Sequence, residues 1–146
     1  MFSAVAICSW NGPSSKSGSS KRRENERRCA RLTLRTAAAV AGLLPAQPAR
    51  LLDIGAGTGS LLRPLARARP DCRFTGIELA PATWLIGRLL AAGQPNIDCR
   101  RGDIFAHPWQ DYDVVYAFLS PVPMAAVWRK ASAELRPGAL LVSNSF

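Results

Sequence analysis

Apolar and polar positions follow two alternating patterns along residues 36–146, and this alternation predicts an α/β fold. Short apolar runs at RLLDI, CRFTGIEL, YDVVYAFLS and ALLVSNSF predict buried strands, and IDCRRGD predicts one more. The segments between them, SLLRPLARAR, PATWLIGRLLAAG and PVPMAAVWRKASAEL, have the spacing of amphipathic helices. Strands that alternate with helices favour a doubly wound, mostly parallel sheet with helices on both faces.

Residues 1–35 have a different composition from the rest of the chain. They hold eight of the 19 basic residues, against Glu24 and Glu26, so most of the net charge of +9 lies here. The stretch NGPSSKSGSSKRRENERR has no apolar periodicity, which predicts a disordered leader, followed by a short helix near residues 32–44. The leader is interpreted as a solvated tail or an extension from an upstream start, and the alternative is an arm that binds nucleic acid or an anionic membrane. We therefore divide the chain into a basic leader, 1–35, and one domain, 36–146.

Targeting signals and metal motifs are not evident in the sequence. No apolar run approaches the roughly 20 residues of a membrane-spanning helix, and the apolar start of the chain has no basic residues ahead of it. Cys8, Cys29, Cys72 and Cys99 form no CxxC pair and have no histidine cluster nearby, so we predict free thiols, no metal site and a cytoplasmic location.

The segment LLDIGAGTGSLL places three glycines at the carboxyl end of the first predicted strand of the domain. In an open parallel sheet this edge is where ligands bind. Gly55 and Gly57 would let the backbone turn sharply and approach a ligand, and Gly59 would let the next helix start close to the strand. The GxGxG spacing differs from the GxGxxG of dinucleotide-binding folds, and no GK[ST] follows to make a phosphate-binding P-loop.

The pattern LLDIGAGTG resembles the first motif of the class I S-adenosylmethionine-dependent methyltransferases, and further matches follow in the family's order. The resemblance implies a Rossmann-like fold with S-adenosylmethionine as cofactor. It implies that Asp53, Gly55, Gly57 and Gly59 form the cofactor turn, with Asp53 facing the methionine end. Glu78 at the end of FTGIEL would hold the ribose, and Asp103 in RRGDIF would contact the adenine. Because ionised carboxylates only accept hydrogen bonds, both acids suit hydroxyl and amino donors.

A narrower similarity concerns the methyl acceptor. FTGIELAPATWLIGRLL, with Pro81 and Trp84, and VVYAFLSPVPM are similar to the protein lysine methyltransferases that include the enzyme acting on the ATP synthase c subunit. This similarity implies a protein lysine as acceptor. Tyr116, Phe118 and Ser120, in and after the fourth strand, are candidates for the acceptor pocket, and sheet core is an equal interpretation of Tyr116 and Phe118. The polar [DN]PP[YF] turn of other amino-group methyltransferases is missing here, and His107 is interpreted as a loop histidine rather than a base.

The chain ends after the fifth strand of the domain, where family members continue with further strands. We therefore expect a sheet truncated after this strand, with an exposed apolar edge that favours a homodimer. Two alternatives to a methyltransferase stay open from the sequence. One is a cofactor-binding module without turnover, and the other is a basic nucleic-acid-binding protein that acts through residues 1–35.

Overall fold

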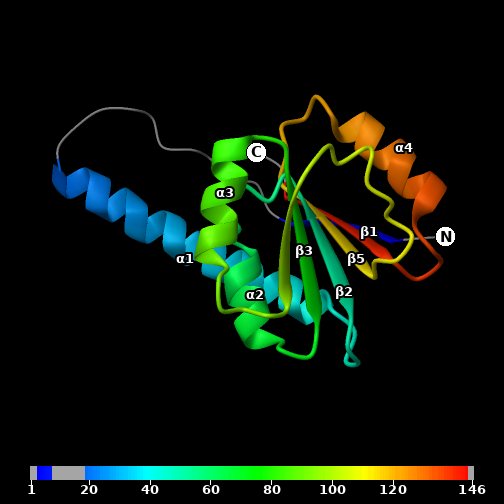
Figure 1. Ribbon diagram of the computed structural model, residues 1–146, viewed down its shortest axis with the longest axis horizontal. Helices are drawn as coiled ribbons and strands as arrows, with labels where there is room; N and C mark the ends of the chain where they lie inside the picture. The colour runs from blue at the N-terminus through cyan, green and yellow to red at the C-terminus, as the bar shows by residue number, and fades with distance from the viewer. Residues whose placement is uncertain (1–2, 8–18, 145–146) are drawn as a thin grey trace.

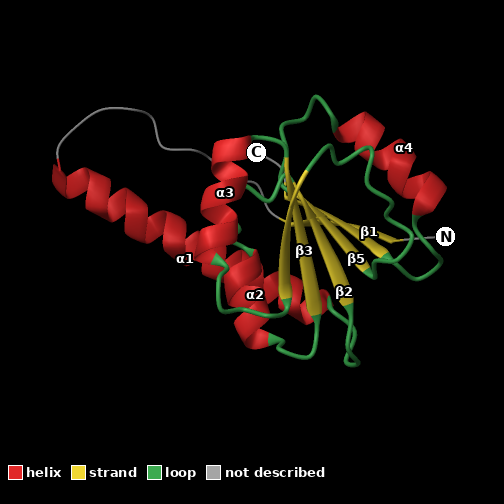
Figure 2. Ribbon diagram, in the orientation of Figure 1, coloured by secondary structure: helices red, strands yellow, loops and turns green. Residues whose placement is uncertain are grey.

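A computed structural model describes residues 3–7 and 19–144, which form one parallel sheet with helices on both faces (Figures 1 and 2). The sheet has six strands in the order β1-β6-β5-β2-β3-β4. The strands are β1 (Ser3–Ile7), β2 (Arg50–Ile54), β3 (Arg73–Glu78), β4 (Ile97–Arg101), β5 (Val114–Ala117) and β6 (Leu140–Asn144). The helices are α1 (Ser19–Leu43), α2 (Leu62–Ala68), α3 (Pro81–Leu90) and α4 (Met124–Glu134). The expected doubly wound parallel sheet is confirmed, and the strands and helices of residues 50–144 lie within a few residues of their predicted positions.

Side chains that alternate along the central strands build a core on each face of the sheet. Leu51 of β2 packs with residues of α1 and α2, whereas Leu52 packs with Val127 and Ala131 of α4. This period of two is the ordinary geometry of a strand, and it explains why the two helical layers take opposite faces. Strand order reverses between β2 and β5. The strands that directly follow β2 in the sequence, β3 and β4, lie on one side of it, whereas β5 and β6 lie on the other side. Such a reversal opens a crevice at the carboxyl ends of the strands.

The outer edge of β6 is covered, in contrast to the expectation of an exposed edge there. β1 pairs with β6 in parallel, from Ser3 opposite Leu140 to Ile7 opposite Asn144. The prediction was wrong on this edge because a strand of the N-terminal segment, read as part of the leader, supplies the missing backbone pairing. A homodimer through the edge of β6 is therefore not available in this arrangement.

Helix α1 also differs from the expected disordered leader, because it begins at Ser19 rather than near residue 32. Its carboxyl-terminal half packs on the sheet through Ala37 and Val40, which are buried. Once these residues fix the helix, extending it toward the N-terminus avoids the nucleation cost, and Arg, Lys and Glu are good helix formers. The expected disorder of residues 1–2 and 8–18 lies outside the described residues, as does Cys8.

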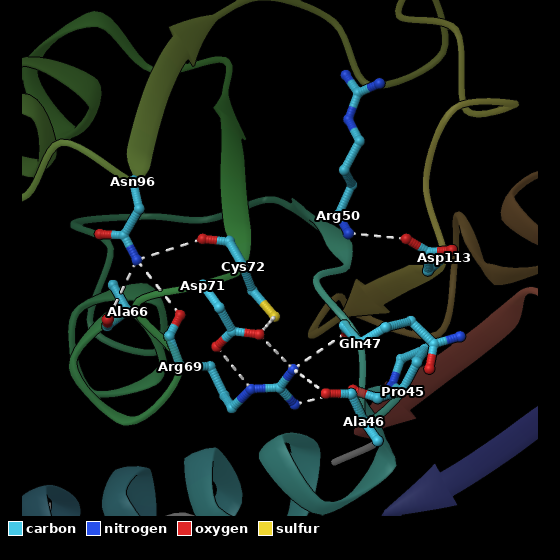
Figure 3. A network of polar contacts seen from close by, with 10 residues as sticks. All are labelled: Pro45, Ala46, Gln47, Arg50, Ala66, Arg69, Asp71, Cys72, Asn96 and Asp113. Carbon is cyan, nitrogen blue, oxygen red and sulfur yellow. Dashed lines mark hydrogen bonds and ion pairs between the residues drawn. The ribbon is translucent and has the colours of Figure 1, made fainter.

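A network of polar contacts anchors the base of α1 to the amino-terminal edge of the sheet (Figure 3). The guanidinium of Arg69 donates to the carbonyls of Pro45 and Gln47, at 2.9 and 3.1 Å, and pairs with Asp71 at 2.7 Å. That pairing lowers the pKa of Asp71 to about 2. Because Pro45 and Gln47 lie in the connection from α1 to β2, this network fixes where α1 leaves the sheet. The side-chain amide of Asn96 donates to three carbonyls around the end of α2.

Within residues 3–7 and 19–144, no helix has both the length and the apolar character needed to cross a bilayer. The same residues contain no group of three or more acidic, histidine or cysteine side chains that could hold a metal ion.

Candidate functional site

The turn after β2 is built on three glycines with left-handed backbone conformations. Gly55, Gly57 and Gly59 have φ of 78°, 56° and 69°, which residues with side chains rarely adopt. The amides of Gly55 and Ala56 both donate to the carbonyl of Ile77, at 3.0 Å each, and this ties the turn to the end of β3. A Cβ on Gly55 would also lie 2.6 Å from Leu119. The sequence motif is therefore a structural turn at the carboxyl edge of the sheet, as expected.

Helix α3 supports this turn from outside through a fourth glycine that sequence reasoning missed. A Cβ on Gly87 would lie 3.1 Å from the carbonyl oxygen of Gly57 and within 3.3 Å of Thr58. Gly87 is the one residue of α3 that is buried, and it lies where the helix packs against the backbone of the turn. In the sequence, Gly87 was visible only as a glycine within a helical pattern, and this pattern did not indicate which segment the helix packs on.

Glu78 joins three turns at the carboxyl ends of β2, β3 and β4. Its two carboxylate oxygens accept hydrogen bonds from the amides of Gly57 and Ala80, at 2.9 Å each. Its own carbonyl accepts from the amide of Gly102, at 3.1 Å. Each carboxylate oxygen keeps a second lone pair for a further donor. The structure thus brings Glu78 and the glycine turn into direct contact, which the sequence spacing alone did not show.

Asp103 and His107 lie in the long loop between β4 and β5, at different distances from the turn. Asp103 is exposed just beyond β4, and its carboxylate accepts from the amide of Phe105 at 2.9 Å. His107 contacts the hydroxyl of Tyr112 at 2.9 Å, near the amino end of β5. Burial, together with the charges of Arg100 and Lys130, lowers the pKa of His107. Because the amino ends of the strands lie at the far edge of the sheet, this geometry supports the reading of His107 as a loop residue.

A cavity of about 510 Å³ lies between α1 and the carboxyl ends of β2, β5 and β6. Asp53, Gly55, Tyr116 and Phe118 line it, so four of the predicted site residues surround one space. Ser120 is exposed in the loop after β5 and is not among the lining residues. Helix α1 closes the opposite wall with six residues, Cys29, Leu32, Thr33, Arg35, Thr36 and Ala39. None of these six was a predicted site residue, because four of them lie in residues 1–35, which were interpreted as leader, and Thr36 and Ala39 lie in the short helix predicted near residues 32–44.

Three polar side chains at the ends of neighbouring strands face α1 from the floor of this cavity. Asp53 of β2 lies opposite Tyr116 of β5 in register, and Tyr116 is hydrogen-bonded to Asn144 of β6. All three are buried, and burial raises the pKa of Tyr116 to about 12. Asn144 was missed by sequence reasoning. Its place at the end of a predicted strand could have indicated a site residue, because the same position led to the prediction of Glu78.

Burial in this row raises the pKa of Asp53 to about 7, with a second contribution from the nearby charge of Glu78. An acid that is harder to ionise in the folded state stabilises the fold only while it is protonated. This contribution is complete below the unfolded pKa of 3.8 and is lost as the pH rises toward about 7.

We expect Asp53→Asn to remove this pH dependence in the cofactor-free protein. Between about pH 4 and pH 8 the wild-type free energy of unfolding should fall relative to the variant, by up to about 4 kcal/mol. Denaturant unfolding across this range measures the difference. Parallel stability curves for the two proteins would show that Asp53 is ionised throughout.

The strand order, the glycine turn and the carboxylates at neighbouring strand ends define a class I S-adenosylmethionine-dependent methyltransferase. The family model described as the ANTKMT methyltransferase domain matches residues 53–146, and the chain belongs to that family. The match begins at Asp53 and includes every predicted site residue. It confirms the predicted family and, with it, the cofactor class.

Comparisons with individual proteins agree on this class. The chain is 47% identical over 38 residues to the release factor glutamine methyltransferase of Escherichia coli K12, which is 26% of this chain and 14% of that enzyme. The mitomycin 7-O-methyltransferase MmcR superposes with a TM-score of 0.63 and 26% identity, over 85% of this chain and 40% of that chain. An RNA methyltransferase of Salinibacter ruber, solved with S-adenosylhomocysteine, superposes with a TM-score of 0.63 and 24% identity, over 80% of this chain and 73% of that one. The chain thus spans a small part of the curated relative that it matches.

Proposed function

We propose that this protein transfers the methyl group of S-adenosylmethionine to a lysine amine of another protein. One observation carries the proposal: the glycine turn and the residues predicted for the acceptor pocket line the same cavity, through Gly55, Tyr116 and Phe118. A cofactor held on the turn would therefore present its methyl group to the space that an acceptor enters. The match to the ANTKMT domain supports a protein lysine as that acceptor.

The charges in the cavity suit the methionine end of the cofactor, which carries an ammonium and a carboxylate. Asp53 is buried on the floor, and Arg35 extends from α1 on the opposite wall. We assign the ammonium to Asp53 and the carboxylate to Arg35, whose planar guanidinium binds carboxylates through paired hydrogen bonds. Binding of the ammonium also offsets the burial of the Asp53 charge, so the acid would ionise as the cofactor enters.

The ribose and the adenine would then lie across the outer side of the glycine turn. Glu78 is held by two backbone amides and keeps acceptor capacity for both ribose hydroxyls. Asp103 is two residues beyond β4 and would accept from the adenine amino group. Next to these acids, Leu79 and Phe105 are exposed at 69% and 39%, and they would supply apolar surface for the flat base.

For transfer of the methyl group, the protein has to position and desolvate the reactants, and it does not have to supply a nucleophile. Bound S-adenosylmethionine supplies an electrophilic methyl group on a sulfonium. The lysine nitrogen, as a neutral amine, would form the new N–CH₃ bond as the S–CH₃ bond breaks, which gives S-adenosylhomocysteine and a methylated ammonium. Before that, a lysine must lose one proton, which costs about 4–5 kcal/mol at pH 7. Tyr116 and Phe118 would lower this cost by surrounding the amine with weakly polar surface.

The role of Arg35 can be tested with a cofactor that lacks the carboxylate. We expect Arg35→Ala to weaken binding of S-adenosylmethionine by about tenfold and to leave decarboxylated S-adenosylmethionine unaffected. Isothermal titration calorimetry with both ligands gives the two ratios. Exposed Arg67 on α2 offers a matched control, Arg67→Ala, which should bind both ligands like the wild type. An equal loss for both ligands in the Arg35 variant would remove the carboxylate assignment.

The proposed reaction is tested by incubating the protein with tritiated S-adenosylmethionine and a lysate from cells grown with a methylation inhibitor. Mass spectrometry should then locate added methyl groups on lysine side chains of labelled proteins. Glu78→Ala serves as the control without cofactor binding. Labelled nucleic acid with unlabelled protein would contradict the proposal, and cofactor binding with no labelled product would favour a module without turnover.

A further inference from the structure

The amino-terminal half of α1 extends away from the sheet, and no other helix or strand of the described residues lies along it in Figures 1 and 2. Arg23, Arg27 and Arg31 are all exposed on this half. From Ala37 onward the helix is partly buried against the sheet. The projecting half is thus a surface beside the cavity, since the lining residues of α1 begin at Cys29.

Three arginines form a row along this surface that leads to the cavity. Arg23, Arg27 and Arg31 follow one another at intervals of four residues, so they lie on one side of the helix, and the next position in the row is Arg35, which lines the cavity. We call Arg23, Arg27 and Arg31 the arginine row. Residues 21–35 hold seven basic residues and two acidic ones, so the segment carries a charge of +5. The row therefore gives the approach to the cavity a strongly positive potential.

We propose that the arginine row binds an acidic segment of the protein whose lysine is methylated. The inference rests on the proposed function and names the sequence context of its acceptor. Successive arginines of the row are about 6 Å apart along the helix axis. In an extended chain, side chains on one face recur about every 6.6 Å, so alternate Asp or Glu residues match the row. A lysine a few residues beyond the last acid would then reach the cavity at Arg35.

Two other anionic partners fit this surface less well. The segment from Ser19 to Arg31 contains no Leu, Ile, Val, Met, Phe, Trp or Tyr, so it offers no large apolar side chain to enter a lipid surface. The same segment has no aromatic side chain to serve as a stacking platform for nucleic-acid bases. What the row does offer is guanidinium groups in regular spacing, and their best ligands in a protein partner are carboxylates.

The test compares two labelled peptides that differ only in charge. One carries three glutamates at alternate positions followed by a single lysine, and the other has glutamine in place of each glutamate. Fluorescence anisotropy in the presence of S-adenosylhomocysteine should show at least about fivefold tighter binding of the acidic peptide. The preference should disappear in the triple variant Arg23→Gln, Arg27→Gln, Arg31→Gln. It should also shrink as the salt concentration rises from about 50 to about 300 mM.

A matched control removes the same charge elsewhere. The variant Arg67→Gln, Arg73→Gln, Arg129→Gln changes three exposed arginines on α2, β3 and α4 and should keep the preference. Both triple variants should bind S-adenosylhomocysteine like the wild type, because neither changes a residue that we assign to the cofactor. Retention of cofactor binding also shows that each variant is folded.

Equal binding of the two peptides, or a preference that survives in the arginine-row variant, would overturn the proposal. So would anionic phospholipid vesicles or a single-stranded oligonucleotide that bind through the row more tightly than the acidic peptide. The failure of this inference can be told apart from a failure of the proposed function. If methyl groups reach lysine at equal rates in both peptides, the lysine acceptor stands and the acidic context is wrong.

Discussion

Replacing Glu78 by alanine is expected to weaken binding of S-adenosylhomocysteine by at least about 100-fold. Glu78 would accept hydrogen bonds from both ribose hydroxyls, and bonds to a charged acceptor contribute about 1.5–3 kcal/mol each. The same carboxylate accepts hydrogen bonds from the amides of Gly57 and Ala80, so its removal also takes away one of the contacts that tie the glycine turn to the end of β3. Calorimetric titration of the variant and the wild type measures the loss.

Two matched changes separate the ribose contact from general damage. Glu78→Gln keeps one acceptor oxygen and should have an intermediate affinity. Glu24→Ala removes an exposed glutamate on α1 that does not line the cavity, and it should bind like the wild type. If Glu78→Ala kept an affinity within about threefold of the wild type, the ribose would have to be bound elsewhere.

The second large effect is expected at Gly57, in comparison with Gly138. Both glycines have positive φ, 56° and 87°, and a Cβ on either would have no heavy atom within 4 Å. Alanine at either position should therefore lower the free energy of unfolding by a similar amount, about 1–2 kcal/mol. Gly57 lies in the cofactor turn, whereas Gly138 lies in the turn before β6, at the other edge of the sheet.

Only Gly57→Ala is expected to impair the cofactor site, with a loss in affinity of about tenfold or more. The open space beside Gly57 is where the cofactor would approach the backbone, and its amide holds Glu78. Thermal unfolding with and without S-adenosylhomocysteine measures the loss of stability and the loss of cofactor affinity in one experiment. Equal ligand-induced shifts in the two variants would show that the turn does not contact the cofactor.

Much of the fold could be predicted from the sequence because residues 50–144 give local signals that agree with one another. Apolar runs such as RLLDI become central strands, and the helices between them begin and end near their predicted limits. Glu78 could be selected from its place at a strand end. The hydrogen bond between Glu78 and the amide of Gly57 could not be predicted, because that contact depends on how two turns meet in space.

The N-terminal segment is where prediction from the sequence failed. α1 was expected to be short because its first half has no apolar stripe, but a helix already packed through Ala37 and Val40 needs none to continue. The pairing of β1 with β6 is a contact between residues more than 130 positions apart, from Ser3 to Leu140, and no local pattern specifies it. Arg35 and Asn144 were missed as cavity residues because both depend on these long-range arrangements.

The most direct test of the central claim is calorimetric titration of the full chain with S-adenosylhomocysteine and, separately, with NAD. The cavity beside the glycine turn, with Asp53 and Glu78 at neighbouring strand ends, predicts binding of one S-adenosylhomocysteine per chain that is lost in Glu78→Ala. It also predicts no comparable binding of NAD. Absence of binding to S-adenosylhomocysteine, or tighter binding of NAD, would contradict the account.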